Sequence, residues 1–250
     1  MIQAGAGPNM NNAIDLSIVV PCLNEEKTVV GTLDTLIAAL QTLTYSYEVL
    51  VIDDGSIDGT ARAVETYISA HPALPIHFHR HPRNRGLSRT YVDGAFLGRG
   101  KYYRLVCADN VEPQETLVAV FRRLGEAEMI IPYHDPVLGK PLLRRALSRI
   151  YTFLVNTLTG HKIHYYNGLA LHLRYNVMRW GPYSFGFGFQ AELITRLLDE
   201  GATYIEIPVL NRHMEKSGRN SALNLMNFLS VGHTLLEMSI RRIRKSIFQK

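Results

Sequence analysis

The feature that most constrains the fold is a regular alternation of short apolar runs and helical patterns over residues 16–132. The apolar runs are rich in β-branched residues and have the length of buried strands, whereas the segments between them space their apolar residues as helices do. Such an alternation favours a mostly parallel sheet covered by helices. The expected strands cover 16–21, 47–52, 74–79, 102–107 and 127–132, and the expected helices cover 25–40, 58–69, 86–97 and 113–124.

Beyond residue 132 the pattern is less regular. It predicts a helix over 141–158, extended structure over 163–173, a helix over 190–198, a strand over 203–209, a polar and basic loop over 211–220, and a helix from 223 onward. We therefore divide the chain into a disordered start over 1–15, one α/β domain over 16–220 and a C-terminal amphipathic helical extension over 221–250.

The positive charge belongs to the C-terminal end. The chain has 27 Lys and Arg residues against 22 Asp and Glu residues, and five of the bases follow the last acid, Glu237, which leaves 22 bases against 22 acids elsewhere. This balance argues against a nucleic-acid-binding face across the domain. In the tail, an apolar helical stripe is flanked by bases: Leu236, Ile240, Ile243 and Ile247 form the stripe, and Arg241, Arg242, Arg244 and Lys245 lie off it.

A basic amphipathic helix of this kind lies on an anionic membrane surface, packs on its own domain, or makes an oligomer contact. No apolar run reaches the ~18 residues that a membrane-spanning helix needs. We therefore expect a cytoplasmic protein, either free or peripheral on the cytoplasmic face of a membrane.

Acidic residues follow two of the expected strands. Asp53 and Asp54 come directly after the second strand, and a glycine and a serine follow them. A carboxylate at such a strand end accepts hydrogen bonds from a uracil or guanine edge or from a ribose hydroxyl, although the same residues also suit a simple turn. Asp109 and Glu112 follow the fourth strand, where carboxylates suit a hard divalent cation that bridges a diphosphate.

Other site chemistries find less support. The sequence has no Walker loop, no Gly-x-Ser-x-Gly elbow and no Gly-x-Gly-x-x-Gly after the first strand. His77, His79 and His81 would share one face of a strand, a spacing that suits a transition metal, but no acid or cysteine joins them in sequence. Cys22 and Cys107 are expected to be buried free thiols.

Several stretches, taken together, resemble the family 2 glycosyltransferases of the GT-A fold, and within them the polyprenyl-phosphate sugar synthases such as dolichol-phosphate mannose synthase. The matching stretches are 19–26 (VVPCLNEE), 48–60 (EVLVIDDGSIDGT), 84–87 (NRGL), the segment around Asp109, 186–193 (GFGFQAEL), and 206–209 (EIPV) with Arg212. The resemblance covers roughly residues 16–220. It implies a three-layer α/β fold with a mostly parallel central sheet and helices on both faces, followed by the C-terminal amphipathic helix.

The resemblance also implies roles for particular residues. The nucleotide-sugar would be bound by Pro21, Asn24, Glu25, Asp53, Asp54, Gly55, Ser56, Asn84, Gly86, Ala108 and Asp109. Arg212, Lys216 and Arg219 would bind phosphate, a task that suits multidentate guanidinium groups. The catalytic residues would be Asp109, Glu192 as an acceptor-side acid, and Arg212, with Asp109 and Glu112 as metal ligands.

The implied activity is an inverting transfer of a sugar from a UDP- or GDP-linked donor to an acceptor such as a polyprenyl phosphate, assisted by Mg²⁺ or Mn²⁺. The chain departs from the family's metal motif, because Cys107 replaces its first acid and Val111 replaces its glutamine. These departures keep open a non-catalytic nucleotide-sugar-binding relative. A nucleotidyltransferase is a third alternative, although its basic Gly-rich signature is absent from the sequence.

Overall fold

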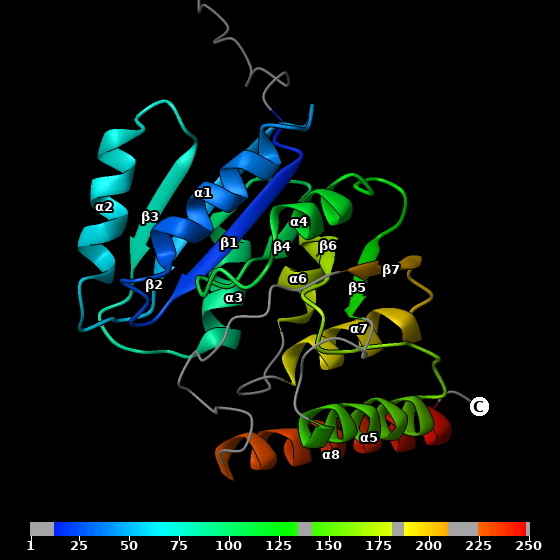
Figure 1. Cartoon of the computed structure of the whole chain (residues 1–250). Coiled ribbons are helices and arrows are strands. Elements are labelled where there is room, and N and C mark those ends of the chain that lie inside the picture. The colour runs from blue at the N-terminus through cyan, green and yellow to red at the C-terminus, as the bar shows by residue number, and fades with distance from the viewer. Residues whose placement is uncertain (1–12, 135–141, 182–187, 210–224, 249–250) are drawn as a thin grey trace, which may run out of the picture.

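The computed structural model describes residues 13–134, 142–181, 188–209 and 225–248, and one seven-stranded sheet organises them (Figure 1). The strand order is β3-β2-β1-β4-β6-β5-β7. All neighbours pair in parallel except β6, which is antiparallel to both β4 and β5. The strands are β1 (Leu16–Cys22), β2 (Tyr47–Asp53), β3 (Ile76–Arg80), β4 (Tyr102–Leu105), β5 (Met129–His134), β6 (Leu171–Leu173) and β7 (Tyr204–Val209).

Helices cover both faces of the sheet because successive residues of a strand point to opposite sides. In β1, Ile18 and Val20 pack in a core with α1, α2 and α4, whereas Val19 packs in a second core with α3, α5, α6, α7 and α8. The predicted three-layer, mostly parallel architecture is thereby confirmed. The helices are α1 (Val29–Leu40), α2 (Thr60–Ala70), α3 (Leu87–Leu97), α4 (Gln114–Phe121), α5 (Leu142–Thr159), α6 (Arg174–Trp180), α7 (Phe189–Asp199) and α8 (Leu225–Phe248).

Several element boundaries differ from the sequence-based expectation. The helix expected from residue 25 begins at Val29, because the preceding chain makes a turn in which Asn24 adopts a left-handed backbone with φ 58°. Of the extended structure expected over 163–173, only β6 is a strand. The short helix α6 follows β6 directly and was not predicted.

The chain ends of the domain are only partly described. Residues 1–12 lie outside the described residues, whereas Asp15, within the start expected to be disordered, exchanges hydrogen bonds with Ser46. At the other end, α8 packs against α5 and α7 (Figure 1). Within the described ranges, no helix combines the length and apolar character needed to cross a membrane.

Candidate functional site

The carboxyl ends of β1 and β2 lie side by side, because the two strands pair in parallel with Cys22 opposite Asp53. β4 flanks β1 on its other side, and β3 flanks β2. The segments that follow these four strands therefore meet at one edge of the sheet, which is where parallel α/β sheets bind their ligands.

The loops after β1 and β2 are fastened to each other by hydrogen bonds. The Asn24 backbone N–H donates to Ser56 Oγ at 2.9 Å, and Asn24 Oδ1 accepts the Ile57 N–H at 2.9 Å. The Glu25 N–H donates to Thr60 Oγ1 at 2.8 Å. These bonds bring together Asn24, Glu25 and Ser56, three residues predicted to contact the nucleotide. In each bond, a side chain is the hydrogen-bond partner of a loop backbone group that would otherwise bind water.

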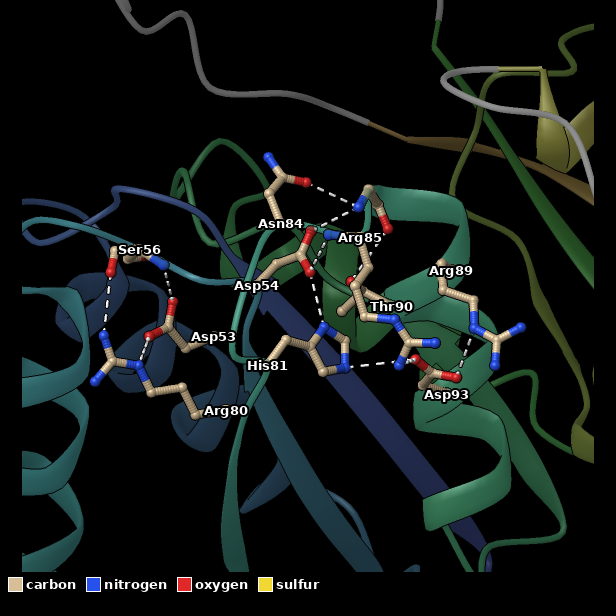
Figure 2. Close-up of polar contacts among 11 residues, drawn as sticks. Asp53, Asp54, Ser56, Arg80, His81, Asn84, Arg85, Arg89, Thr90 and Asp93 are labelled. Atoms are coloured by element: carbon tan, nitrogen blue, oxygen red, sulfur yellow. Dashed lines mark hydrogen bonds and ion pairs between the residues drawn. The ribbon is translucent and has the colours of Figure 1, made fainter.

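Asp53 lies at the base of this edge and is fully buried. Its Oδ1 accepts the Ser56 N–H at 2.9 Å, and its Oδ2 stands 3.0 Å from Arg80 Nε (Figure 2). Arg80 also donates to the Ser56 carbonyl at 3.1 Å, while its side chain remains 56% exposed. Arg80 therefore covers Asp53, so a nucleotide that reaches this carboxylate meets an arginine at the same point.

Asp54 holds the turn after β3 in place. Its carboxylate is almost completely buried and accepts hydrogen bonds from the Arg85 N–H at 2.9 Å and the Gly86 N–H at 2.8 Å. It also contacts His81 Nδ1 at 2.7 Å (Figure 2). With these partners Asp54 acts as a positioning residue for the turn that carries Asn84 and Gly86.

Two glycines with left-handed backbones lie in the loops after β2 and β3. Gly55 has φ +80°, and a Cβ built on it would stand 2.7 Å from the Arg83 carbonyl carbon. Gly86 has φ +87° and precedes α3, and its N–H also contacts Asn84 Oδ1 at 2.9 Å. A side chain at Gly55 would push the loops after β2 and β3 apart, because the contact is with backbone atoms that cannot rotate away.

A cluster of bases around Asp93 supports the same turn. Asp93 Oδ2 lies 2.7 Å from Arg85 Nη1 and 3.4 Å from His81 Nε2, and its Oδ1 lies 3.0 Å from Arg89 Nε. Sequence reasoning missed this cluster and the Arg80 contact. The only available signal was the i, i+4 spacing of Arg89 and Asp93 on a helix, which is common on solvent-exposed faces.

The segment after β4 places Asp109 in a half-buried position. Burial raises the pKa of its carboxyl above the ordinary range, although the Val111 N–H donates to Oδ1 at 3.4 Å. The next residue, Asn110, has φ 53° and accepts a hydrogen bond from the Thr35 hydroxyl at 3.2 Å. Asp109 is therefore held on a constrained turn, where burial disfavours its ionised form.

The neighbours of Asp109 contribute less to a cation site. Burial, together with the charges of Asp109 and Glu112, raises the pKa of the Cys107 thiol, so the side chain stays a neutral thiol. Glu112 Oε1 is 2.5 Å from Nη2 of Arg104, a fully buried arginine. Ala108 lies in the core. Among the described residues, no group of three or more His, Cys, Asp or Glu side chains is placed to hold a metal ion, His77, His79 and His81 included.

The remaining predicted residues lie toward the second half of the chain. Glu192, in the first turn of α7, is only 3% exposed, and its Oε1 accepts a hydrogen bond from Arg196 at 2.9 Å. Its charge raises the pKa of Tyr151 on α5, after the larger effects of burial and Tyr166, so Glu192 faces the α5 side of the domain. Arg212, Lys216 and Arg219 lie outside the described residues.

A mostly parallel sheet whose strand ends carry acidic turns is the architecture of a nucleotide-binding α/β enzyme domain. The chain belongs to glycosyl transferase family 2, whose family model matches residues 17–179.

Curated relatives cover parts of the chain. A dolichyl-phosphate beta-glucosyltransferase of Dictyostelium discoideum is 39% identical over 106 residues, which are 39% of this chain and 32% of that protein. A dodecaprenyl-phosphate galacturonate synthase of Rhizobium johnstonii is 24% identical over 62% of this chain and 46% of that protein. A dolichol-phosphate mannosyltransferase of Saccharomyces cerevisiae is 25% identical over 59% of this chain and 57% of that protein. The chain thus spans about a third to just over half of the length of these relatives.

Solved structures confirm the GT-A fold. A glucosyl-3-phosphoglycerate synthase from Mycobacterium tuberculosis, in complex with Mn²⁺, UDP and phosphoglyceric acid, superposes with a TM-score of 0.70 at 15% identity, over 90% of this chain and 78% of that one. A mannosyltransferase from Pyrobaculum calidifontis, in complex with GDP-Man and Mn²⁺, gives a TM-score of 0.66 at 20% identity, over 95% of this chain and 66% of that one.

Proposed function

We propose that this domain transfers a sugar from a UDP- or GDP-linked donor to a polyprenyl phosphate, with inversion at the anomeric carbon. The observation that carries the proposal is the hydrogen-bonded edge formed by the loops after β1, β2 and β3. Asn24 bonds to Ser56 of the loop after β2, Asp53 bonds to Ser56 within its own loop, and Asp54 bonds to Arg85 of the turn after β3. The names of the curated relatives, all of which include a polyprenyl-type phosphate, support the acceptor class.

The donor would lie across this edge, with its base near Asp53 and Arg80 and its diphosphate toward Asp109. Arg212, Lys216 and Arg219 are proposed to bind phosphate from the segment outside the described residues. Guanidinium groups suit that role because they donate several hydrogen bonds in a fixed plane. Pro21, Glu25 and Gly55 would shape the floor against which the nucleotide lies.

The residues after β4 fit a weakly held Mg²⁺ or Mn²⁺. Such cations take one or two carboxylates and complete their shell with phosphate and water oxygens, so Asp109 suffices as the main protein ligand. Glu112 could bind the cation only while its carboxylate also contacts Arg104, because Oε1 already lies 2.5 Å from that guanidinium. The cation would neutralise charge on the leaving nucleoside diphosphate.

The burial of Glu192 favours a phosphate acceptor over a hydroxyl acceptor. A hydroxyl acceptor needs a general base within hydrogen-bond reach, whereas a phosphate is already an anionic nucleophile. Glu192 is 3% exposed and bonded to Arg196, so using it as a base would require the carboxylate to leave this pair. A phosphate acceptor places no such demand on the chain.

The test is a turnover assay of the protein with UDP- and GDP-sugars, polyprenyl phosphate and Mn²⁺, measuring released nucleoside diphosphate. Asp109→Asn is expected to lower the rate by about 100-fold, the scale of losing one electrostatic contact to the leaving group. Glu115→Gln, which changes an exposed acid on α4, is the matched control and should keep full activity. Cys107→Asp, which restores a second acid, should lower the Mn²⁺ concentration needed for half-maximal activity.

Stability measurements separate chemistry from misfolding. Because burial raises the pKa of Asp109, the folded protein disfavours the ionised carboxylate. The free energy of unfolding therefore falls as the pH rises through the folded pKa and the carboxyl loses its proton. Asp109→Asn should therefore be at least as stable as the unchanged protein at neutral pH. Absence of both binding and turnover with every donor would refute the proposed activity, and binding without turnover would favour a non-catalytic relative.

A further inference from the structure

The two helices α5 and α8 expose large apolar side chains. On α5, Phe153 is 68% exposed and Ile150 is 55% exposed, with Leu154 beside them. On α8, Leu236 is 58% exposed and Ile243 is 57% exposed. Isolated exposed apolar residues are ordinary on protein surfaces, but a group of them on neighbouring elements marks an interaction surface.

Each helix directs these residues away from the domain. In α5, Tyr151 and Val155 are buried in the core, and Phe153 lies on the opposite side of the helix. In α8, Met238 is buried, while Leu236, Ile240 and Ile243 follow the i, i+4, i+7 spacing of one face. The outward apolar stripe of each helix is therefore left uncovered by the described part of the domain.

The stripes belong to one surface because the helices pack together. Figure 1 shows α5 and α8 side by side at one end of the molecule, and the two helices contact each other. The C-terminal end of α5 lies next to α8, since a Cβ built on Gly160 would stand 3.2 Å from Arg242 Nη2. We call the outward faces of the two helices the α5–α8 surface.

Among the described side chains of α5 and α8, exposed bases outnumber exposed acids, since Glu237 is the one exposed acid among them. Arg241 is used inside the domain, where it contacts Thr195 and Asp199. Arg149, Arg242 and Arg244 are exposed. Apolar stripes flanked by bases are complementary to an anionic lipid surface, which accepts both.

In Figure 1, the arrowhead of β5 points toward α5 and α8, and the arrowhead of β1 points to the lower left of the view.

From these observations we infer that α5 and α8 together form a docking surface for an anionic membrane, with Phe153 and Leu236 as its apolar anchors. The inference rests on the proposed lipid-phosphate acceptor and adds α5 to the surface that the C-terminal sequence alone indicates. Docking brings the acceptor and the site into one plane, because the lipid phosphate stays at the membrane surface while its chain remains in the bilayer.

The test is flotation of the full chain with vesicles of phosphatidylcholine, with and without phosphatidylserine. The protein should float with the anionic vesicles, and the double variant Phe153→Glu, Leu236→Glu should reduce the bound fraction by about tenfold. Phe96→Glu is the matched control, because Phe96 is 60% exposed, against 68% for Phe153, but lies on α3. It should leave flotation unchanged, and circular dichroism should show that all variants are folded.

Activity measurements distinguish this inference from the proposed function. The double variant should lose turnover with polyprenyl phosphate in vesicles but keep it with a short-chain acceptor in solution. An active protein that does not bind vesicles would overturn the docking surface and leave the proposed function intact. Loss of a dimer in the double variant, measured by sedimentation without lipid, would instead assign the surface to a second copy of the chain.

Discussion

The loops at the sheet edge and the helices α5, α7 and α8 are held together in different ways. At the edge, buried side chains bond directly to backbone groups of other loops, as Asp54 does with Arg85 and Gly86. Among the helices, polar contacts join side chains to side chains: Asp199 on α7 contacts Arg241 on α8 and His161, which follows α5.

This difference affects how each region depends on a ligand. Backbone groups held by buried carboxylates have few alternative positions, so the edge is organised before any nucleotide arrives. Side-chain pairs that are partly exposed add little stability, and the helices rely more on apolar packing, which the α5–α8 surface leaves incomplete. The loops at the sheet edge are therefore organised without a ligand. The apolar side chains of the α5–α8 surface need a partner to cover them.

Asp54→Ala should have the largest effect on stability. It removes the buried acceptor of two backbone N–H groups and of His81, so we expect the free energy of unfolding to fall by about 3 kcal/mol, measured by urea denaturation. Asp93→Ala removes only side-chain ion pairs from the same turn and should cost about 1 kcal/mol. Equal losses in the two variants would contradict the distinction between backbone and side-chain anchoring.

His172 lies where the sheet contacts helix α7, between the two regions. It lies on β6, between β4 and β5, and its Nε2 is 3.4 Å from Oε1 of Gln190 on α7. Burial lowers its pKa from 6.5 to about 4, so the folded protein keeps the ring neutral where the unfolded chain protonates it. Burying the neutral ring therefore stabilises the folded protein fully only above pH 6.5. As the pH falls from 6.5 to about 4, the free energy of unfolding should fall by about 3 kcal/mol.

His172→Asn should remove this pH dependence. Unfolding by urea at neutral pH and near the folded pKa would measure it in the variant and in the unchanged protein. The exposed His77 provides the matched control substitution, His77→Asn. A His172 variant with an undiminished slope would show that another group causes the loss of stability in acid.

The strands β1, β2 and β4 could be predicted because each is a short run buried on both faces of the sheet. The edge strand β3 is only partly buried. The acids at the ends of β2 and β4 follow from the same pattern, since parallel strands bring their carboxyl ends to one edge. The antiparallel β6 was not identified as a separate strand, because three residues carry too little periodicity.

The partners of the site residues could not be predicted in the same way. Arg80 with Asp53, and His81 with Asp54, join residues 27 positions apart in sequence that meet only once β2 and β3 pair. Arg104 lies inside an otherwise apolar strand, and only the fold shows that Glu112 returns to neutralise it. A sequence pattern indicates which residue types follow a strand, but a contact also depends on backbone turns such as the one at Asn24.

The smallest expected change in the free energy of unfolding comes from Arg241, which joins α8 to α7. Its Nη2 donates to Thr195 Oγ1 at 2.7 Å and its Nε lies 3.4 Å from Asp199 Oδ2, so Arg241→Ala should lower the free energy of unfolding by about 1 kcal/mol. The adjacent Arg242 is exposed, and Arg242→Ala should change it by less than about 0.5 kcal/mol.

Hydrogen exchange can locate where the Arg241 effect acts. If these contacts fasten α8 to α7, Arg241→Ala should speed amide exchange in α8 while the amides of β1 and β2 exchange as before, since the sheet edge has its own anchors. Faster exchange throughout the domain would mean that the two regions open together. Faster exchange confined to α8 would mean that the helix can loosen from the domain without disturbing the sheet edge.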